Sequence, residues 1–207
     1  MIKRQAFLMA AIAAGLSMTA MAETAGTWTV GVGVGHVEPD SKNGSLGDIG
    51  IDHIDPDVRP TLTAEYFVAD NVGVELLAAL PFHHDIIIDV PDFGMREAKT
   101  QLLPPTLSLQ YHFDNVHANV KPFVGVGANY TTFFKERSGV NGVDLKIKDS
   151  WGVAGHAGVD FKINETDAVR LDARYIDLEP DVKLDGQKVG KAEINPWVYG
   201  ISYVQRF

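Results

Sequence analysis

The residues with the strongest potential for chemistry are histidines and acids in short combinations. His83, His84 and Asp85 are adjacent, and two imidazoles beside a carboxylate could bind a metal ion. Adjacent residues of a strand point in opposite directions, however, and no second ligand cluster is evident in the sequence, so a solvated loop is preferred. His156 and Asp160 share one strand face without a serine in an elbow motif. The sequence therefore predicts no enzyme, no cofactor and no metal site.

Composition excludes further classes of protein. The chain has 207 residues, with 18 Lys and Arg against 27 Asp and Glu, and it has no cysteine. The acidic balance argues against a nucleic-acid partner, because phosphate binding needs a basic surface. The lack of cysteine excludes disulfides and thiolate metal sites. The alternating glycines of residues 30–35 are followed by no predicted helix, so they do not form a nucleotide-binding loop.

The first residues have the pattern of a secretory signal peptide. Lys3 and Arg4 precede an apolar run from Phe7 to Leu16, and Ala20-Met21-Ala22 is a small-residue cleavage signal. The apolar run is too short for a membrane anchor helix. We therefore expect residues 1–22 to be removed and residues 23–207 to form the exported protein.

The remainder of the chain alternates apolar residues with polar or small ones, the period of a β-strand. Eight segments show this alternation: residues 28–35, 62–68, 72–79, 106–113, 124–130, 151–161, 169–175 and 197–207. Short connections with turn residues alternate with long ones, at roughly 38–59, 81–101, 135–149 and 178–194. An even strand count with short turns at one end and long loops at the other is typical of outer-membrane barrels. The sequence predicts an all-β fold, an eight-stranded antiparallel transmembrane β-barrel over residues 23–207 with short periplasmic turns and long extracellular loops.

The distribution of side chains indicates which face of the strands contacts lipid. Aromatic residues on the apolar face form two levels: Trp28, Tyr66, Tyr111, Phe113, Phe161 and Phe207 near the short turns, and Tyr130, Phe134, Trp151, Tyr175 and Trp197 near the long loops. Two aromatic levels match the two membrane interfaces. The alternative, a soluble barrel, would have to bury the many charges of the opposite face in its core. As the wall of a salt-bridged lumen these charges are favourable.

Several segments also resemble the outer membrane protein W family, a relative of the alkane-uptake outer-membrane proteins. The resemblance rests on residues 70–82 (DNVGVELLAALPF), 103–107 (LPPTL), 122–134 (PFVGVGANYTTFF), 148–152 (KDSWG) and 195–207, which begins NPWVY and ends at Phe207. It spans nearly the whole of the exported chain. It implies an eight-stranded barrel in the outer membrane of a Gram-negative bacterium and a role in the passage of small hydrophobic molecules.

The interior of such a barrel has room only for side chains or one small ligand. Strand parity predicts that charged residues form a polar plug in the lower lumen: Glu65, Glu75, Arg170 and Arg174. Inward apolar residues beside Glu65 and Glu75, together with apolar residues of the loop 81–101, are the candidate substrate path: Leu77, Phe67, Phe123, Phe133, Ile86, Ile87, Ile88 and Phe93. These loop residues either form an apolar entrance, or pack against the other loops or extend the third and fourth strands beyond the bilayer. Ile49, Ile51 and Ile54 of the first loop could complete either arrangement. Inward glycines either leave space for a solute or let a small barrel curve tightly.

Two functional hypotheses follow. The first is an outer-membrane channel for small hydrophobic molecules, with lateral exit into the membrane. The second is a non-transporting barrel that acts as a surface receptor, adhesin or envelope stabiliser. Outer-membrane lipids, small hydrophobic solutes and the barrel-assembly machinery are the expected partners, and Tyr203 and Phe207 resemble the C-terminal signal which that machinery reads. The oligomeric state and the identity of the solute do not follow from the residues.

Overall fold

The computed structural model describes residues 23–40, 44–46, 49–90, 94–113, 119–138 and 142–207. For residues 44–46, 49–53, 88–90 and 94–96 it describes the backbone only. The predicted signal peptide, residues 1–22, lies outside the described residues. Among the described residues, no helix is long and apolar enough to span a membrane.

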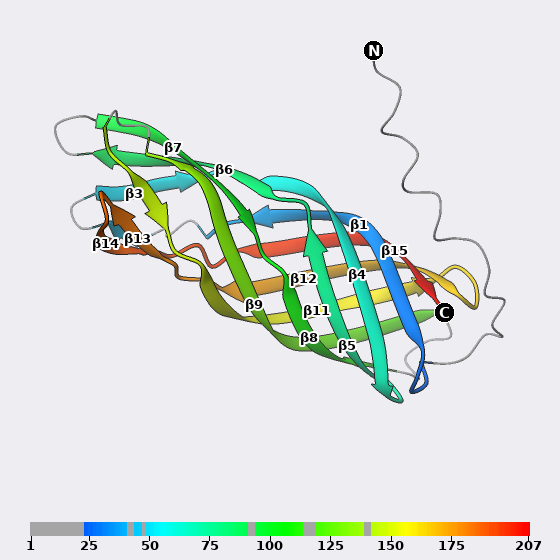
Figure 1. Ribbon diagram of the computed structural model, residues 1–207. Helices are drawn as coiled ribbons and strands as arrows, with labels where there is room; N and C mark the ends of the chain where they lie inside the picture. The colour runs from blue at the N-terminus through cyan, green and yellow to red at the C-terminus, as the bar shows by residue number, and fades with distance from the viewer. Residues whose placement is uncertain (1–22, 41–43, 47–48, 91–93, 114–118, 139–141) are drawn as a thin grey trace, which may run out of the picture.

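Eight long strands form a closed antiparallel barrel (Figure 1). They are β1 (Trp28–Glu38), β4 (Asp57–Ala69), β5 (Val72–Ala79), β8 (Thr106–His112), β9 (Val120–Arg137), β11 (Ser150–Lys162), β12 (Asp167–Asp177) and β15 (Trp197–Arg206). Each strand pairs with its neighbour in this order, and β15 pairs with β1. The last residue, Phe207, exchanges backbone hydrogen bonds with Trp28, which closes the barrel at the end of the short turns. Closure of the barrel leaves no unpaired strand edge in lipid. All eight predicted strands are confirmed.

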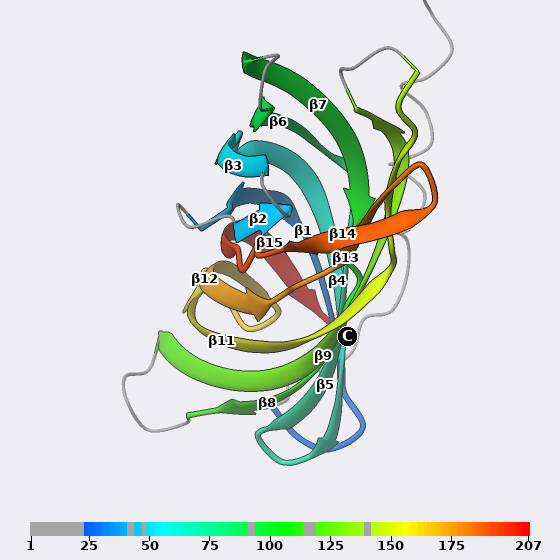
Figure 2. The ribbon, with the colours of Figure 1, turned by 90° about the vertical axis from the view of Figure 1, so that its left-hand side faces the viewer.

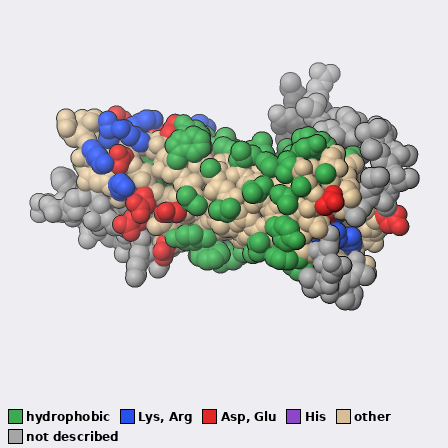
Figure 3. Space-filling model, turned by 90° about the horizontal axis from the view of Figure 1, so that it is seen from below, with side chains coloured by type: hydrophobic (Ala, Val, Ile, Leu, Met, Phe, Trp, Pro, Cys, Tyr) green, Lys and Arg blue, Asp and Glu red, His purple; other side chains and the backbone are tan. Residues whose placement is uncertain are grey.

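Side chains face outward or inward as the period of two predicts. On β9, Val124 and Val126 are exposed on the outer surface, whereas Phe123 and Asn129 are buried inside. Figure 3 shows the resulting apolar surface over the middle of the molecule and charged side chains toward its two ends. Aromatic pairs mark both borders of this surface: Trp28–Tyr66 and Tyr111–Phe113 near the short turns, Tyr130–Trp151 and Tyr175–Trp197 near the long connections. These are the two interfacial girdles of a membrane barrel.

The long connections contain seven further strands, which extend the barrel beyond the aromatic girdle that lies near them. They are β2 (Gly44–Leu46), β3 (Ile49–Ile54), β6 (Phe82–Val90), β7 (Gly94–Leu103), β10 (Leu145–Ile147), β13 (Asp181–Leu184) and β14 (Gln187–Ala192). The pairing runs β10-β13-β14-β2-β3-β6-β7 and continues onto the upper part of β9. Figure 2, which faces this end, shows the strands arranged around the barrel mouth. By the rule for bacterial barrels, this end is extracellular.

Candidate functional site in the barrel lumen

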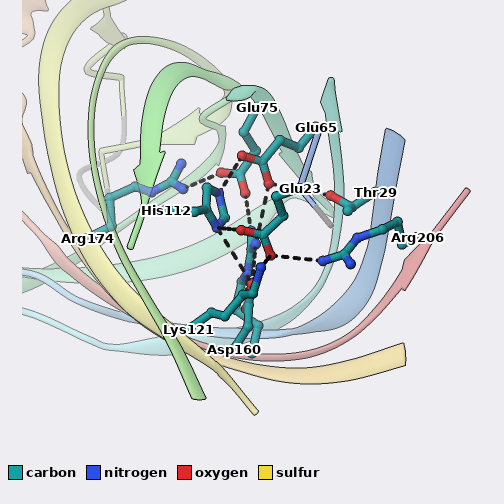
Figure 4. Close-up of polar contacts among 10 residues, drawn as sticks. Glu23, Thr29, Glu65, Glu75, His112, Lys121, Asp160, Arg174 and Arg206 are labelled. Carbon is teal, nitrogen blue, oxygen red and sulfur yellow. Dashed lines mark hydrogen bonds and ion pairs between the residues drawn. The ribbon is translucent and has the colours of Figure 1, made fainter. Parts of the chain in front are cut away.

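A network of charged side chains fills the lumen toward the periplasmic end (Figure 4). We call it the polar layer, and it consists of Glu23, Thr29, Glu65, Glu75, His112, Lys121, Asp160, Arg170, Arg174 and Arg206. Its members lie on all eight barrel strands, except Glu23, which precedes β1. All of its side chains are buried apart from that of Arg206, which is half-buried. The layer therefore ties together strands that are far apart in the wall.

Arg170 is the centre of the polar layer. Its Nε and Nη2 atoms donate to the two carboxylate oxygens of Asp160 at 2.7 and 2.9 Å. Its Nη1 atom donates to Glu75 at 2.9 Å, and Nη2 also reaches Glu65 at 3.4 Å. A planar guanidinium with five N–H groups can serve several carboxylates at once, as it does here. The guanidinium also lies 4.4 Å from the centre of the Phe123 ring, a cation–π contact.

Two more groups complete the polar layer around these carboxylates. Arg174 donates to the second oxygen of Glu75 at 2.8 Å, and the His112 ring lies 2.8 Å from the second oxygen of Glu65. Since both partners of each contact are buried, removal of one would leave the other uncompensated in a medium of low dielectric constant. The geometry fixes these groups by specific pairings.

Glu23 closes the network at the periplasmic side. Its carboxylate lies 2.8 Å from Arg206 on the last strand and 3.1 Å from Lys121 on β9. The sequence interpretation missed Glu23, because a charged residue before the first strand carries no local signal of burial. Only the closed barrel brings it beside Arg206, 183 positions away in the sequence.

Two aromatic residues that we expected on the substrate path pack against side chains of the polar layer. Phe123 stacks on the His112 ring with centroids 5.2 Å apart, and Phe67 meets the same ring edge-on at 5.2 Å. Both are almost fully buried. Strand parity correctly gave their inward direction beside Glu65 and Glu75, but it could not give their packing against His112 and Arg170.

The extracellular half of the lumen is filled by an apolar cluster. We define it by Val37, Ile54, Phe82, Ala98, Leu102, Phe133, Leu145, Ile147, Ala154, Ile176, Leu178, Val182, Ala192, Ile194 and Val198, all buried. Ile86 packs against it. The side chains come from the tops of the barrel strands and from the extracellular strands. Of the alternatives for the loop residues, the described part of the chain shows strands that extend beyond the bilayer, with Ile54 and Ile86 packed on their inner side.

The other predicted path residues have different positions. Ile87 follows Ile86 on β6 and points to the opposite side of the strand, away from the apolar cluster. The backbone of Ile88 continues β6, but its side chain, and all of Phe93, lie outside the described residues. Leu77 borders a cavity of about 20 Å³ that Glu75, Phe123 and Arg174 also line. This volume suits one water molecule, not a solute.

Two of the inward glycines support the steric alternative at the level of the polar layer. A Cβ atom at Gly73 would overlap the Glu65 carboxylate, and one at Gly158 would overlap the Phe123 ring. These positions are glycine because large side chains of the polar layer already occupy the space. They do not leave an open route at this depth.

The closed eight-stranded barrel has an apolar outer surface between two aromatic girdles and a lumen filled by the polar layer and the apolar cluster. These features define an integral β-barrel protein of the bacterial outer membrane. Within that class, the family model "OmpW family" matches residues 24–207, and the chain belongs to this family. It is 38% identical over 205 residues to outer membrane protein W of Escherichia coli, covering 93% of each chain. It is 30% identical over 155 residues to outer membrane protein AlkL of Ectopseudomonas oleovorans, covering 72% of this chain and 66% of that one.

Solved structures agree with the fold. The crystal structure of the outer membrane protein OprG from Pseudomonas aeruginosa superposes with a TM-score of 0.77 at 33% identity. The match covers 90% of this chain and 98% of OprG. The resemblance noted in the sequence is thus confirmed as family membership, and the predicted fold and outer-membrane location are confirmed with it.

Proposed function

We propose that this chain is a channel through which small hydrophobic molecules pass from the cell surface into the outer membrane. The apolar cluster above the polar layer is the observation that carries this proposal. An apolar solute that displaces side chains of the cluster breaks no hydrogen bond or ion pair and gains burial and dispersion contacts, which have no fixed direction. The family resemblance implies the same class of solute.

The polar layer supports an end to the path inside the lumen. A solute that passed Leu77 would have to separate Arg170 and Arg174 from Glu75, to which they are bonded at 2.9 and 2.8 Å. It would offer no hydrogen bond in return, so its free energy would rise. Glu65, Glu75, Arg170 and Arg174 therefore act in this proposal as the plug.

An interruption in the barrel wall supports lateral exit at this height. The pairing of β5 with β8 ends at Leu77 and Thr106, and the pairing of β6 with β7 begins at Phe82 and Leu102. The intervening segments contain Pro81, Pro104 and Pro105, which have no N–H to donate to a ladder. The wall thus has its break between the apolar cluster and the polar layer, where a solute stopped from below could leave sideways.

The test compares two neighbouring isoleucines of β6. Ile86→Asp places a charge against the apolar cluster, whereas Ile87→Asp places the same charge on the opposite side of the strand. We expect the first variant to slow uptake of a hydrophobic dye by whole cells and the second to leave it unchanged. A small sugar should pass slowly in every case. Equal dye uptake by the parent, Ile86→Asp and cells without the protein, with normal assembly, would favour the receptor or stabiliser alternative.

The role of the C-terminus as an assembly signal is a separate proposal. Tyr203 is exposed on the lipid face, and Phe207 ends the strand that closes the barrel against β1. Deletion of Phe207 should therefore lower the amount of heat-modifiable protein in the outer membrane, whereas Gln187→Ala in the extracellular hairpin should not. N-terminal sequencing of the same material would test cleavage before Glu23.

A further inference from the structure

Among the described residues of the extracellular half of the lumen, His84 has a buried polar atom that the packing does not explain. His84 lies on the inner face of β6 between Phe82 and Ile86, and it is 2% exposed. Its ring lies roughly parallel to that of Phe82, with centroids 6.5 Å apart. The Nε2 atom is fully buried and has no hydrogen-bond partner among the described residues. Buried polar groups are nearly always paired, so this atom requires a reason.

The other ring nitrogen determines what Nε2 can do. Nδ1 lies 2.6 Å from the backbone oxygen of Asp55, and a carbonyl oxygen can only accept a hydrogen bond. Nδ1 must therefore carry the proton. Burial lowers the pKa of His84 below its ordinary value, against the opposing influence of the Asp55 and Asp57 carboxylates. The ring is then neutral at pH 7, and Nε2 presents a bare lone pair.

The neighbours of His84 along the inner face of β6 are apolar, and its cross-strand neighbour on β7 is the buried Thr100, whose hydroxyl donates to the backbone oxygen of Gln101. Phe82 belongs to the apolar cluster and Ile86 packs against it, and both share the inner face of β6 with His84. A molecule that entered the cluster would gain from burial along its length. Only a group with an O–H or N–H would also satisfy Nε2.

We propose that Nε2 of His84 is the polar anchor of a binding site in the apolar cluster, specific for small apolar molecules that carry a hydroxyl donor, such as medium-chain alkanols. This inference rests on the proposed channel function and names its substrate class. A carboxylate would bring its negative charge against the lone pair, and an alkane or ether would leave Nε2 unpaired. The site therefore discriminates by the donor, not by chain length.

Solid-state NMR of the unmodified protein in lipid bilayers tests the site directly. With ¹⁵N-labelled histidine, the Nε2 resonance of His84 is assigned by its loss in His84→Gln. Addition of 1-octanol should move this resonance in the direction of a hydrogen-bonded acceptor, whereas octyl methyl ether and octane should leave it in place. The same movement with all three additives, or none with octanol, would overturn the inference. So would a resonance that is already hydrogen-bonded without additive, which would indicate a water partner.

A transport measurement separates failure of this inference from failure of the channel. We expect whole-cell uptake of 1-octanol relative to octane to fall by about three- to tenfold in His84→Leu, the effect of one hydrogen bond. His84→Gln, whose amide oxygen can accept, should recover part of the ratio. Octane uptake that depends on the protein, with an unchanged ratio in His84→Leu, would refute the anchor and keep the channel. Absence of protein-dependent octane uptake would refute the channel, while the NMR result would still decide the anchor.

Discussion

In the periplasmic half of the lumen, Arg170 bonds to three carboxylates from three other strands. In the extracellular half, Leu102 and Phe133 pack among side chains that have no charge. Both sets are buried by the same inward parity of the strands. The difference is that ion pairs require particular partners, whereas apolar contacts can be exchanged. One barrel therefore joins a half held by specific ion pairs to a half held by apolar contacts, and the proposed function requires that the second half admits the solute.

The largest effect should come from the centre of the polar layer. Arg170→Met leaves Asp160, Glu65 and Glu75 buried without their shared cation, and the loss of one partner of a buried pair costs about 3–5 kcal/mol. We expect a corresponding fall in the free energy of unfolding, measured by urea titration in lipid vesicles. Lys188→Met is the matched control, because it removes a cation from the exposed pair with Asp181. Equal stability of the two variants would show that the polar layer is not a specific network.

A somewhat smaller loss of stability should follow from a charge on the lipid-facing side of the barrel, and it tests which residues of β9 point outward. Val126 is 58% exposed on the outer surface between the two aromatic girdles. Val126→Arg should destabilise the barrel by about 2–4 kcal/mol, the cost of a cation at the bilayer midplane. Gln187→Arg, in the extracellular hairpin, should change the unfolding midpoint little. A harmless Val126→Arg would mean that the strand register of β9 is wrong.

The smallest effect should be found in the apolar cluster. Leu102→Met conserves volume and apolar character, and such exchanges usually cost less than about 1.5 kcal/mol. Glu75→Gln conserves size as well, but it removes the charge that two arginines share, and we expect a clearly larger loss. Urea titration of both variants in lipid vesicles measures the two losses in the free energy of unfolding. If Leu102→Met were as damaging as Glu75→Gln, the apolar cluster would be as rigidly specified as the polar layer.

The sequence predicted the barrel well because its strands follow a local rule. Alternation alone gave the eight strands and the outward direction of residues such as Val126. It left the extension of the third and fourth strands as one of several alternatives, since the segment Phe82-His83-His84-Asp85-Ile86-Ile87 mixes apolar and polar residues on both faces, and it did not give the other extracellular strands. Their order comes from pairing with distant segments, as in the contact of Ile54 with Ile86.

For the lumen, the sequence predicted which side chains point inward, but not which of them contact one another. Parity gave Glu65 and Arg170 as inward residues, but their contact joins strands 105 positions apart. The same limit hid the burial of Glu23. It also hid the contact of Phe67 with the ring of His112, which places Phe67 beside the polar layer. The burial of His84 was missed for a different reason: beside His83 it resembles a solvated loop, and only the pairing of β6 with β3 and β7 shows that its ring is enclosed.

The central claim is that an apolar solute occupies the extracellular half of the lumen and stops above the polar layer. Photolabelling with an alkyl diazirine in outer-membrane vesicles, read by mass spectrometry, tests it most directly. Inward residues are compared with one another, because lipid-facing residues are labelled at every height. We expect label on Phe133, Leu102 and Leu77 and none on Phe67 or His112. Label on Phe67 and His112 equal to that on Phe133 would show that the solute crosses the polar layer and would refute a path that ends above it.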